Sequence, residues 1–169
     1  IVSHIYQYTT KYIKDELSDV IVFEYLNFGY SSSTLFEMFL EYIKKPFQLG
    51  VSFADDIKRA VICNKTVLAK AVVRKVGGTN TAFIRGGCPC TLILNQALRE
   101  LGCEAAVNVC MHRQHFTLIT SSKKTCSSMF EEYVSRFIYN GCGSYSCGAC
   151  FGADYTFEEF ISAFSECKN

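Results

Sequence analysis

The segment from Thr79 to Thr120 constrains the fold of this chain more strongly than any other. Its pattern of apolar, glycine and polar residues predicts a strand at 82–84, a helix at 89–101 and a strand hairpin at 105–120. Two strands joined through a helix form a βαβ unit, in which the strands are parallel and the crossover is right-handed. The segment therefore predicts an α/β fold.

Two apolar runs before this segment have the length of strands. Asp19–Leu26 is apolar nearly throughout, which is typical of a strand buried on both faces, and 47–53 can form a second short strand. With these two strands, helices and strands alternate through most of the chain. We therefore expect a single α/β domain over residues 1–169, with a mixed, mostly parallel sheet, flanking helices and one antiparallel hairpin.

Apolar residues at helical spacing predict the helices around these strands. Ser31–Ser33 can cap a helix that ends before Pro46. The buried face of this helix would consist of Leu35, Phe36, Phe39, Leu40 and Ile43. A longer helix begins at Asp55 or Asp56 and is closed by Gly77-Gly78.

Composition excludes several classes of protein. Hydrophobic residues make up 49% of the chain and charged residues 20%, which argues against intrinsic disorder. No apolar run approaches the ~20 residues that span a bilayer. The net charge of +1 produces no strong field toward nucleic acid or anionic membranes. Basic side chains on the helix that starts at Asp55 form either an anion or RNA surface or a solvated face, and the lack of interleaved aromatic residues favours the solvated face.

The ten cysteines indicate the cellular compartment of the protein, and the first residue indicates whether the chain was cut from a longer polypeptide. Cys63 and Cys110 fall on apolar faces of predicted elements, as buried free thiols do in a reducing compartment. We therefore favour an intracellular, cytoplasmic protein. The chain begins at Ile1 without methionine, which we interpret as the sign of an excised part of a longer polypeptide, viral or multidomain.

Two cysteines, Cys88 and Cys90, lie where the glycine loop enters the helix at 89–101. A thiol at a helix N-terminus is near unpaired N–H groups and the positive end of the helix dipole, and both favour the reactive thiolate. His115, or alternatively His112, at the turn between the following strands, is the candidate base. The alternative interpretation is a buried or metal-bound cysteine pair and a hydrogen-bonded histidine at a strand end.

The loop before these cysteines could bind an oxyanion. Arg85 adds positive charge, and Gly86 and Gly87 would let backbone amides approach a bound anion closely.

The residues Arg85-Gly86-Gly87, the following cysteine, Asn95 and Leu98–Gly102 resemble the active-site segment of arylamine N-acetyltransferases. More loosely, the segment is similar to the cysteine helix of transglutaminase-like and papain-like thiol enzymes. The resemblance implies acyl or peptidyl transfer, or hydrolysis, by a helix-capping cysteine that meets a histidine on a following strand.

A second group of cysteines lies in a glycine-rich segment, 141–153, that we expect to be a loop. Cys147 and Cys150 have the two-residue spacing of a zinc knuckle, and Cys142 is a looser third ligand. Cys126, Cys167 or a histidine could complete a tetrahedral zinc site. A disulfide within the loop and free thiols are the alternatives.

Two functions follow from these patterns. The first is a cysteine-dependent acyl or peptidyl transferase or hydrolase, with a small acyl or peptide substrate. The second is a non-catalytic interaction domain of a larger polypeptide, with structural cysteines and one zinc ion, that binds protein or, less well supported by the charge pattern, nucleic acid.

Overall fold

A computed structural model describes the chain over residues 1–13, 19–28, 30–86 and 91–166. Its internal contacts divide the chain into two compact units, Ile1–Lys65 (unit 1) and Thr66–Asn169 (unit 2), which we describe one at a time. The single domain expected from the sequence stays a prediction. In the described parts of the chain, no helix combines the length and the apolar character needed to cross a bilayer.

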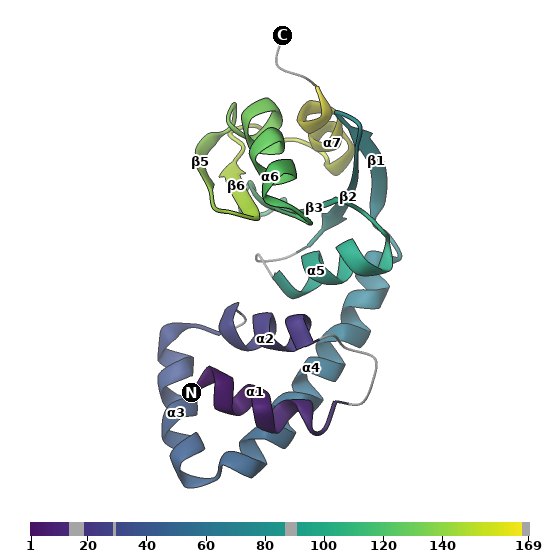
Figure 1. Cartoon of the computed structure of the whole chain (residues 1–169). Coiled ribbons are helices and arrows are strands. Elements are labelled where there is room, and N and C mark those ends of the chain that lie inside the picture. Colours follow the sequence, from purple (N-terminus) through teal and green to yellow (C-terminus); the bar gives the residue numbers. More distant parts are fainter. Residues whose placement is uncertain (14–18, 29, 87–90, 167–169) are drawn as a thin grey trace. The chain divides into compact units, whose positions relative to one another are not determined.

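Unit 1 is built from helices in its described residues (Figure 1). They are α1 (Val2–Thr10), α2 (Asp19–Phe28), α3 (Ser32–Lys44) and α4 (Pro46–Leu68), the last of which runs into unit 2. Their shared core contains Ile5, Val22, Leu26, Met38, Phe53, Ile57 and Val61.

The two strands predicted in unit 1 are wrong, because both segments are helical. The run 19–26 lies in α2, and 47–53 lies in the first turns of α4, which starts with Pro46 at a position where its missing N–H costs nothing. A short apolar run does not distinguish a buried strand from a helix by periodicity. In α2 the exposure varies with helical spacing: Val22 and Leu26 are buried, and Phe23 between them is 45% exposed.

Unit 2 contains a six-stranded sheet with the order β1-β2-β3-β4-β6-β5. The strands are β1 (Val72–Val76), β2 (Thr79–Arg85), β3 (Ala105–Cys110), β4 (His115–Thr120), β5 (Ile138–Cys142) and β6 (Ser146–Cys150). The helices are α5 (Thr91–Glu100), α6 (Lys123–Met129), which continues as a π-helical turn (Phe130–Val134), and α7 (Phe157–Ser165).

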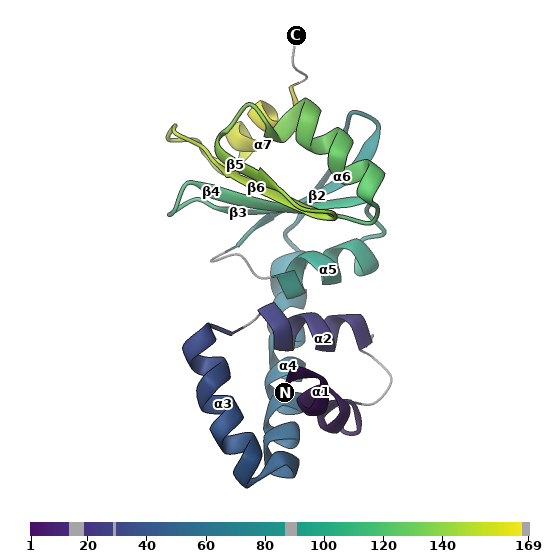
Figure 2. The same ribbon diagram turned by 60° about the vertical axis from the view of Figure 1, so that its left-hand side comes forward.

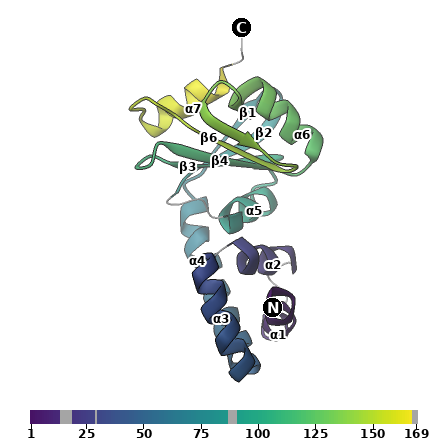
Figure 3. The same ribbon diagram turned by 90° about the vertical axis from the view of Figure 1, so that its left-hand side faces the viewer.

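Helices cover both faces of this sheet (Figures 2 and 3). Helix α5 covers one face, and the cluster there contains Ala82, Ile84, Leu94, Ala97, Ala106 and Ile119. Helices α6 and α7 cover the other face, where the larger cluster includes Phe83, Val107, Phe116, Leu118, Phe160 and Phe164. Strand alternation sends successive side chains of β2, β3 and β4 into these two cores in turn.

The α/β class, the mixed sheet, the β2–α5–β3 crossover and the β3–β4 hairpin are confirmed. The expectation of a mostly parallel sheet is wrong, because β2–β3 is the one parallel pair among the described strands. Gly77 and Gly78, expected to close a helix, instead form the β1–β2 turn, with φ angles of 55° and 87° that favour glycine. The segment 141–153, expected to be a loop, instead supplies parts of the hairpin strands β5 and β6.

Candidate functional sites

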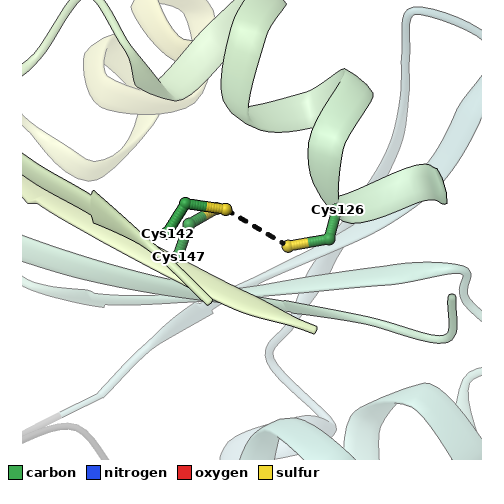
Figure 4. A group of neighbouring side chains, drawn as sticks. All are labelled: Cys126, Cys142 and Cys147. Atoms are coloured by element: carbon green, nitrogen blue, oxygen red, sulfur yellow. Dashed lines mark hydrogen bonds between the residues drawn. The ribbon is translucent and has the colours of Figure 1, made fainter. Parts of the chain in front are cut away.

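Three cysteines from separate elements of unit 2 meet on the sheet face covered by α6 and α7 (Figure 4). Cys126 comes from α6, Cys142 from the end of β5 and Cys147 from β6. Their Sγ atoms lie within 4.8 Å of one another, and the Cys126–Cys142 pair is 3.8 Å apart. All three thiols are free. We call this group the cysteine cluster.

Local structure explains why these three side chains converge. Cys142 and Cys147 are direct register partners across the β5–β6 hairpin, so the short turn between them places both on the same face. Ser122 caps the N-terminus of α6, because its side chain accepts a hydrogen bond from the Thr125 backbone N–H, and the helix that starts there carries Cys126 into the core beside the hairpin.

Two cysteines of the cluster are buried and the third is exposed. Cys126 and Cys147 are 0% and 4% exposed, whereas Cys142 is an exposed residue. Burial raises the pKa of the Cys126 thiol, and hydrogen bonding with Cys142 raises it further. Burial also raises the pKa of Cys147 well above its ordinary value, with the neighbouring Cys126 and Cys142 adding to the effect. Without a bound cation, the two buried thiols are therefore protonated at neutral pH.

The structure brings together two of the three predicted zinc ligands, Cys142 and Cys147, with Cys126, which the sequence offered as a fourth. Cys150 does not join them. Three residues after Cys147 on the same strand, it points to the opposite face of the sheet. Cys167 lies outside the described residues.

The predicted base His115 begins β4 and is partly buried. It pairs with Cys110 on β3 and Cys150 on β6, so all three side chains share the sheet face covered by α5. Burial lowers the pKa of His115, and the positive charge of Arg113 lowers it further. The imidazole is therefore neutral at pH 7 and can accept a proton. His112 lies exposed in the turn between the two strands.

The predicted anion-binding loop is described only in part. Arg85 is the exposed last residue of β2, and strand alternation directs it away from the α5 face. Gly86 packs so closely on Asn108 that a Cβ there would lie 2.0 Å from Asn108 Oδ1. Gly87, Cys88 and Cys90 lie outside the described residues, so the predicted cysteine–histidine pair stays a prediction.

Asn108 is a buried polar residue that the sequence reasoning missed. It is 2% exposed on β3, and its Oδ1 has no hydrogen-bond partner among the described residues. An asparagine in the middle of the apolar strand Ala105–Cys110 is the sequence signal that marks it.

Helix α3 exposes the apolar side chains that the sequence predicted to be buried. Phe36, Leu40 and Ile43 are 61%, 44% and 62% exposed, so this part of the prediction is wrong. The face of α3 that packs into unit 1 instead carries Met38, which is 7% exposed, and Tyr42, whose hydroxyl hydrogen-bonds His4 Nδ1 at 2.9 Å. We call Phe36, Leu40 and Ile43 the α3 stripe.

No family model and no curated protein matches the chain. Among solved structures, the chain is similar to an uncharacterized protein from Helicobacter pylori G27, at 10% sequence identity and a TM-score of 0.49. The similarity covers 98% of this chain and 50% of that chain, so this chain spans about half the length of the other. A similarity this weak carries no argument about fold or function.

Proposed function

We propose that the chain is an interaction domain that binds a second copy of itself through helix α3. The observation that carries this proposal is the exposed α3 stripe. Leu40 lies about 200° around the helix from the buried Met38, because successive helical residues are about 100° apart. Helix α3 is therefore apolar on two opposite sides, and a helix of this kind is stable in water when both sides are covered.

The charges beside the α3 stripe favour a second copy as the occupant. Glu37 and Lys44 are seven residues apart, so they lie nearly in line along one flank of the stripe. In an antiparallel pair with a twofold axis near Leu40, Glu37 of each helix faces Lys44 of the other. The same surface is thus complementary to itself, as a twofold dimer requires. Lys44 also contacts Glu41 at 3.3 Å within its own helix.

Replacing one residue of the stripe should separate the two copies. Ile43→Glu places a carboxylate within the apolar contact, and we expect the dimer Kd to rise at least about a hundredfold, since an unpaired buried charge costs several kcal/mol. Sedimentation velocity over a wide range of concentration measures this change. Ile62→Glu is the matched control, because Ile62 is 66% exposed on α4 and outside the stripe, and it should leave the Kd unchanged.

Charge variants test the antiparallel arrangement itself. Glu37→Lys and Lys44→Glu each create like charges across the twofold axis, so each variant alone should dimerise about tenfold or more weakly than the wild type. An equimolar mixture of the two should recover the affinity, because opposite charges then face each other. A wild-type chain that stays monomeric at every concentration, or a dimer that is insensitive to Ile43→Glu, would contradict the proposal.

His115 favours a second candidate function, a thiol enzyme that carries out acyl or peptidyl transfer or hydrolysis. The glycine loop follows β2 and precedes α5, which starts at Thr91, so it is part of the β2–α5–β3 crossover. Strand β4, whose first residue is His115, pairs with β3. A neutral imidazole there could take the proton of Cys88 or Cys90, and Cys150 is a described thiol on the same sheet face.

The rate of iodoacetamide labelling against pH tests this second function. We expect one thiol to react fast at neutral pH, with a midpoint below the ordinary histidine pKa of ~6.5, because burial and Arg113 lower the pKa of His115. His115→Gln should move that midpoint toward the ordinary thiol value of ~8.5, and His112→Gln should not. Slow labelling of every thiol under native conditions would end this candidate.

A further inference from the structure

We propose that Cys126, Cys142 and Cys147 bind one zinc ion and leave its fourth coordination position open to solvent. The inference is independent of the proposed pairing through α3, because it concerns unit 2 and different residues. It also differs from the site predicted from sequence, because Cys126 takes the place of Cys150.

The spacing of the sulfur atoms fits a tetrahedral zinc site. A Zn–S bond of about 2.3 Å places two thiolates at tetrahedral corners about 3.8 Å apart. Cys126 Sγ and Cys142 Sγ are 3.8 Å apart, and the third sulfur lies within 4.8 Å of both. A disulfide needs a separation of about 2.05 Å, so the observed spacing excludes a bonded pair and matches the separation of two ligands on one zinc ion.

Thiolate ligands select the ion. Sulfur donors favour zinc and other thiophilic ions over magnesium and calcium, which require oxygen ligands. Each thiol must lose its proton to bind, so zinc displaces protons from Cys126, Cys142 and Cys147 as the three Zn–S bonds form. Zinc affinity should therefore increase as pH rises.

The exposure of the three cysteines decides what occupies the fourth position. Cys126 and Cys147 approach from the buried side, and Cys142 lies at the exposed end of β5. The Gly143 carbonyl oxygen, 3.2 Å from Cys142 Sγ, accepts a hydrogen bond from this thiol. A zinc ion held by the three sulfurs would have its remaining corner on the side of the exposed Cys142, where water would complete the coordination.

Metal content and cysteine variants test the site. The chain purified under reducing conditions should bind one equivalent of zinc by inductively coupled plasma mass spectrometry, and cobalt in its place should give sulfur-to-metal charge-transfer absorption. Cys142→Ser removes an exposed ligand without opening the core, and we expect zinc affinity to fall more than about a hundredfold in competition with a chromophoric chelator. Cys126→Ser should have the same effect.

Cys150→Ser is the matched control, since Cys150 lies on the other face of the same strand, and it should keep the wild-type affinity. Less than one equivalent in the wild type, unchanged binding by Cys142→Ser, or loss of binding in Cys150→Ser would overturn the proposal. A Cys126–Cys142 disulfide that forms in place of metal binding, detected by mass spectrometry of peptides, would overturn it as well.

Discussion

Replacing Phe164 with alanine should lower the free energy of unfolding of unit 2 by about 3–5 kcal/mol, the range typical of a large aromatic side chain removed from a core. Phe164 is 0% exposed on α7. Its ring lies 5.5 Å from both Phe83 and Phe116 and 5.9 Å from Phe160, centre to centre. The truncation therefore leaves a cavity where α7 meets the sheet, and it removes several aromatic pairs that each add about 0.5–1.5 kcal/mol.

Urea denaturation of the whole chain, with hydrogen exchange of β3 and β4 amides reporting on unit 2, measures this loss. Tyr139→Ala is the matched control, because Tyr139 is an aromatic residue of the same unit that is 87% exposed. Its truncation should change stability by less than about 0.5 kcal/mol. If Phe164→Ala cost as little as the control, α7 could not pack on the sheet as described.

Gly50→Ala should destabilise unit 1 by about 3 kcal/mol, although alanine in a helix is ordinarily favoured over glycine by about 1 kcal/mol. A Cβ at Gly50 of α4 would lie 2.6 Å from the Cβ of Tyr8 and 3.2 Å from its carbonyl carbon in α1. These atoms belong to the backbone or are bonded to it, so no rotation of the Tyr8 side chain relieves the overlap. The two helices would have to separate, which would open the core around Ile5.

Hydrogen exchange of the α1 and α4 amides measures this effect on unit 1. Ser52→Ala, at an exposed position two residues along the same helix, should be neutral or slightly stabilising. A Gly50→Ala variant as stable as the wild type would contradict the close approach of α1 and α4.

The sequence predicted the centre of unit 2 well, because the signals there are local. The β2–α5–β3–β4 order follows from short apolar strands, a glycine loop and a helix closed by Gly102. Periodicity also placed α3 between Ser31 and Pro46. The residues that cap and break a helix act within one turn, so their effect can be read without tertiary contacts.

The prediction failed where two structures satisfy the same pattern. Asp19–Leu26 is apolar enough for a buried strand or a packed helix, and the partner that decides between them is distant in sequence. In α3 the pattern identified an apolar face correctly, but not whether protein or solvent covers it. Packing in the core of unit 1 buried Met38 and left Phe36, Leu40 and Ile43 exposed.

The sequence alone determined that this chain has an α/β fold, and its cysteine spacing offered Cys142 and Cys147 as ligands of one zinc site, which the β5–β6 hairpin brings together. Only the tertiary structure selected Cys126 from the candidate fourth ligands and removed Cys150 from the set. A ligand from α6 reaches the cluster because that helix packs on one face of the sheet, and strand alternation turns Cys150 to the other face. Spacing along the chain does not contain the first fact, because Cys126 reaches the other two cysteines only through the packing of α6 on the sheet. It would contain the second only if 146–150 were recognised as a strand rather than a loop.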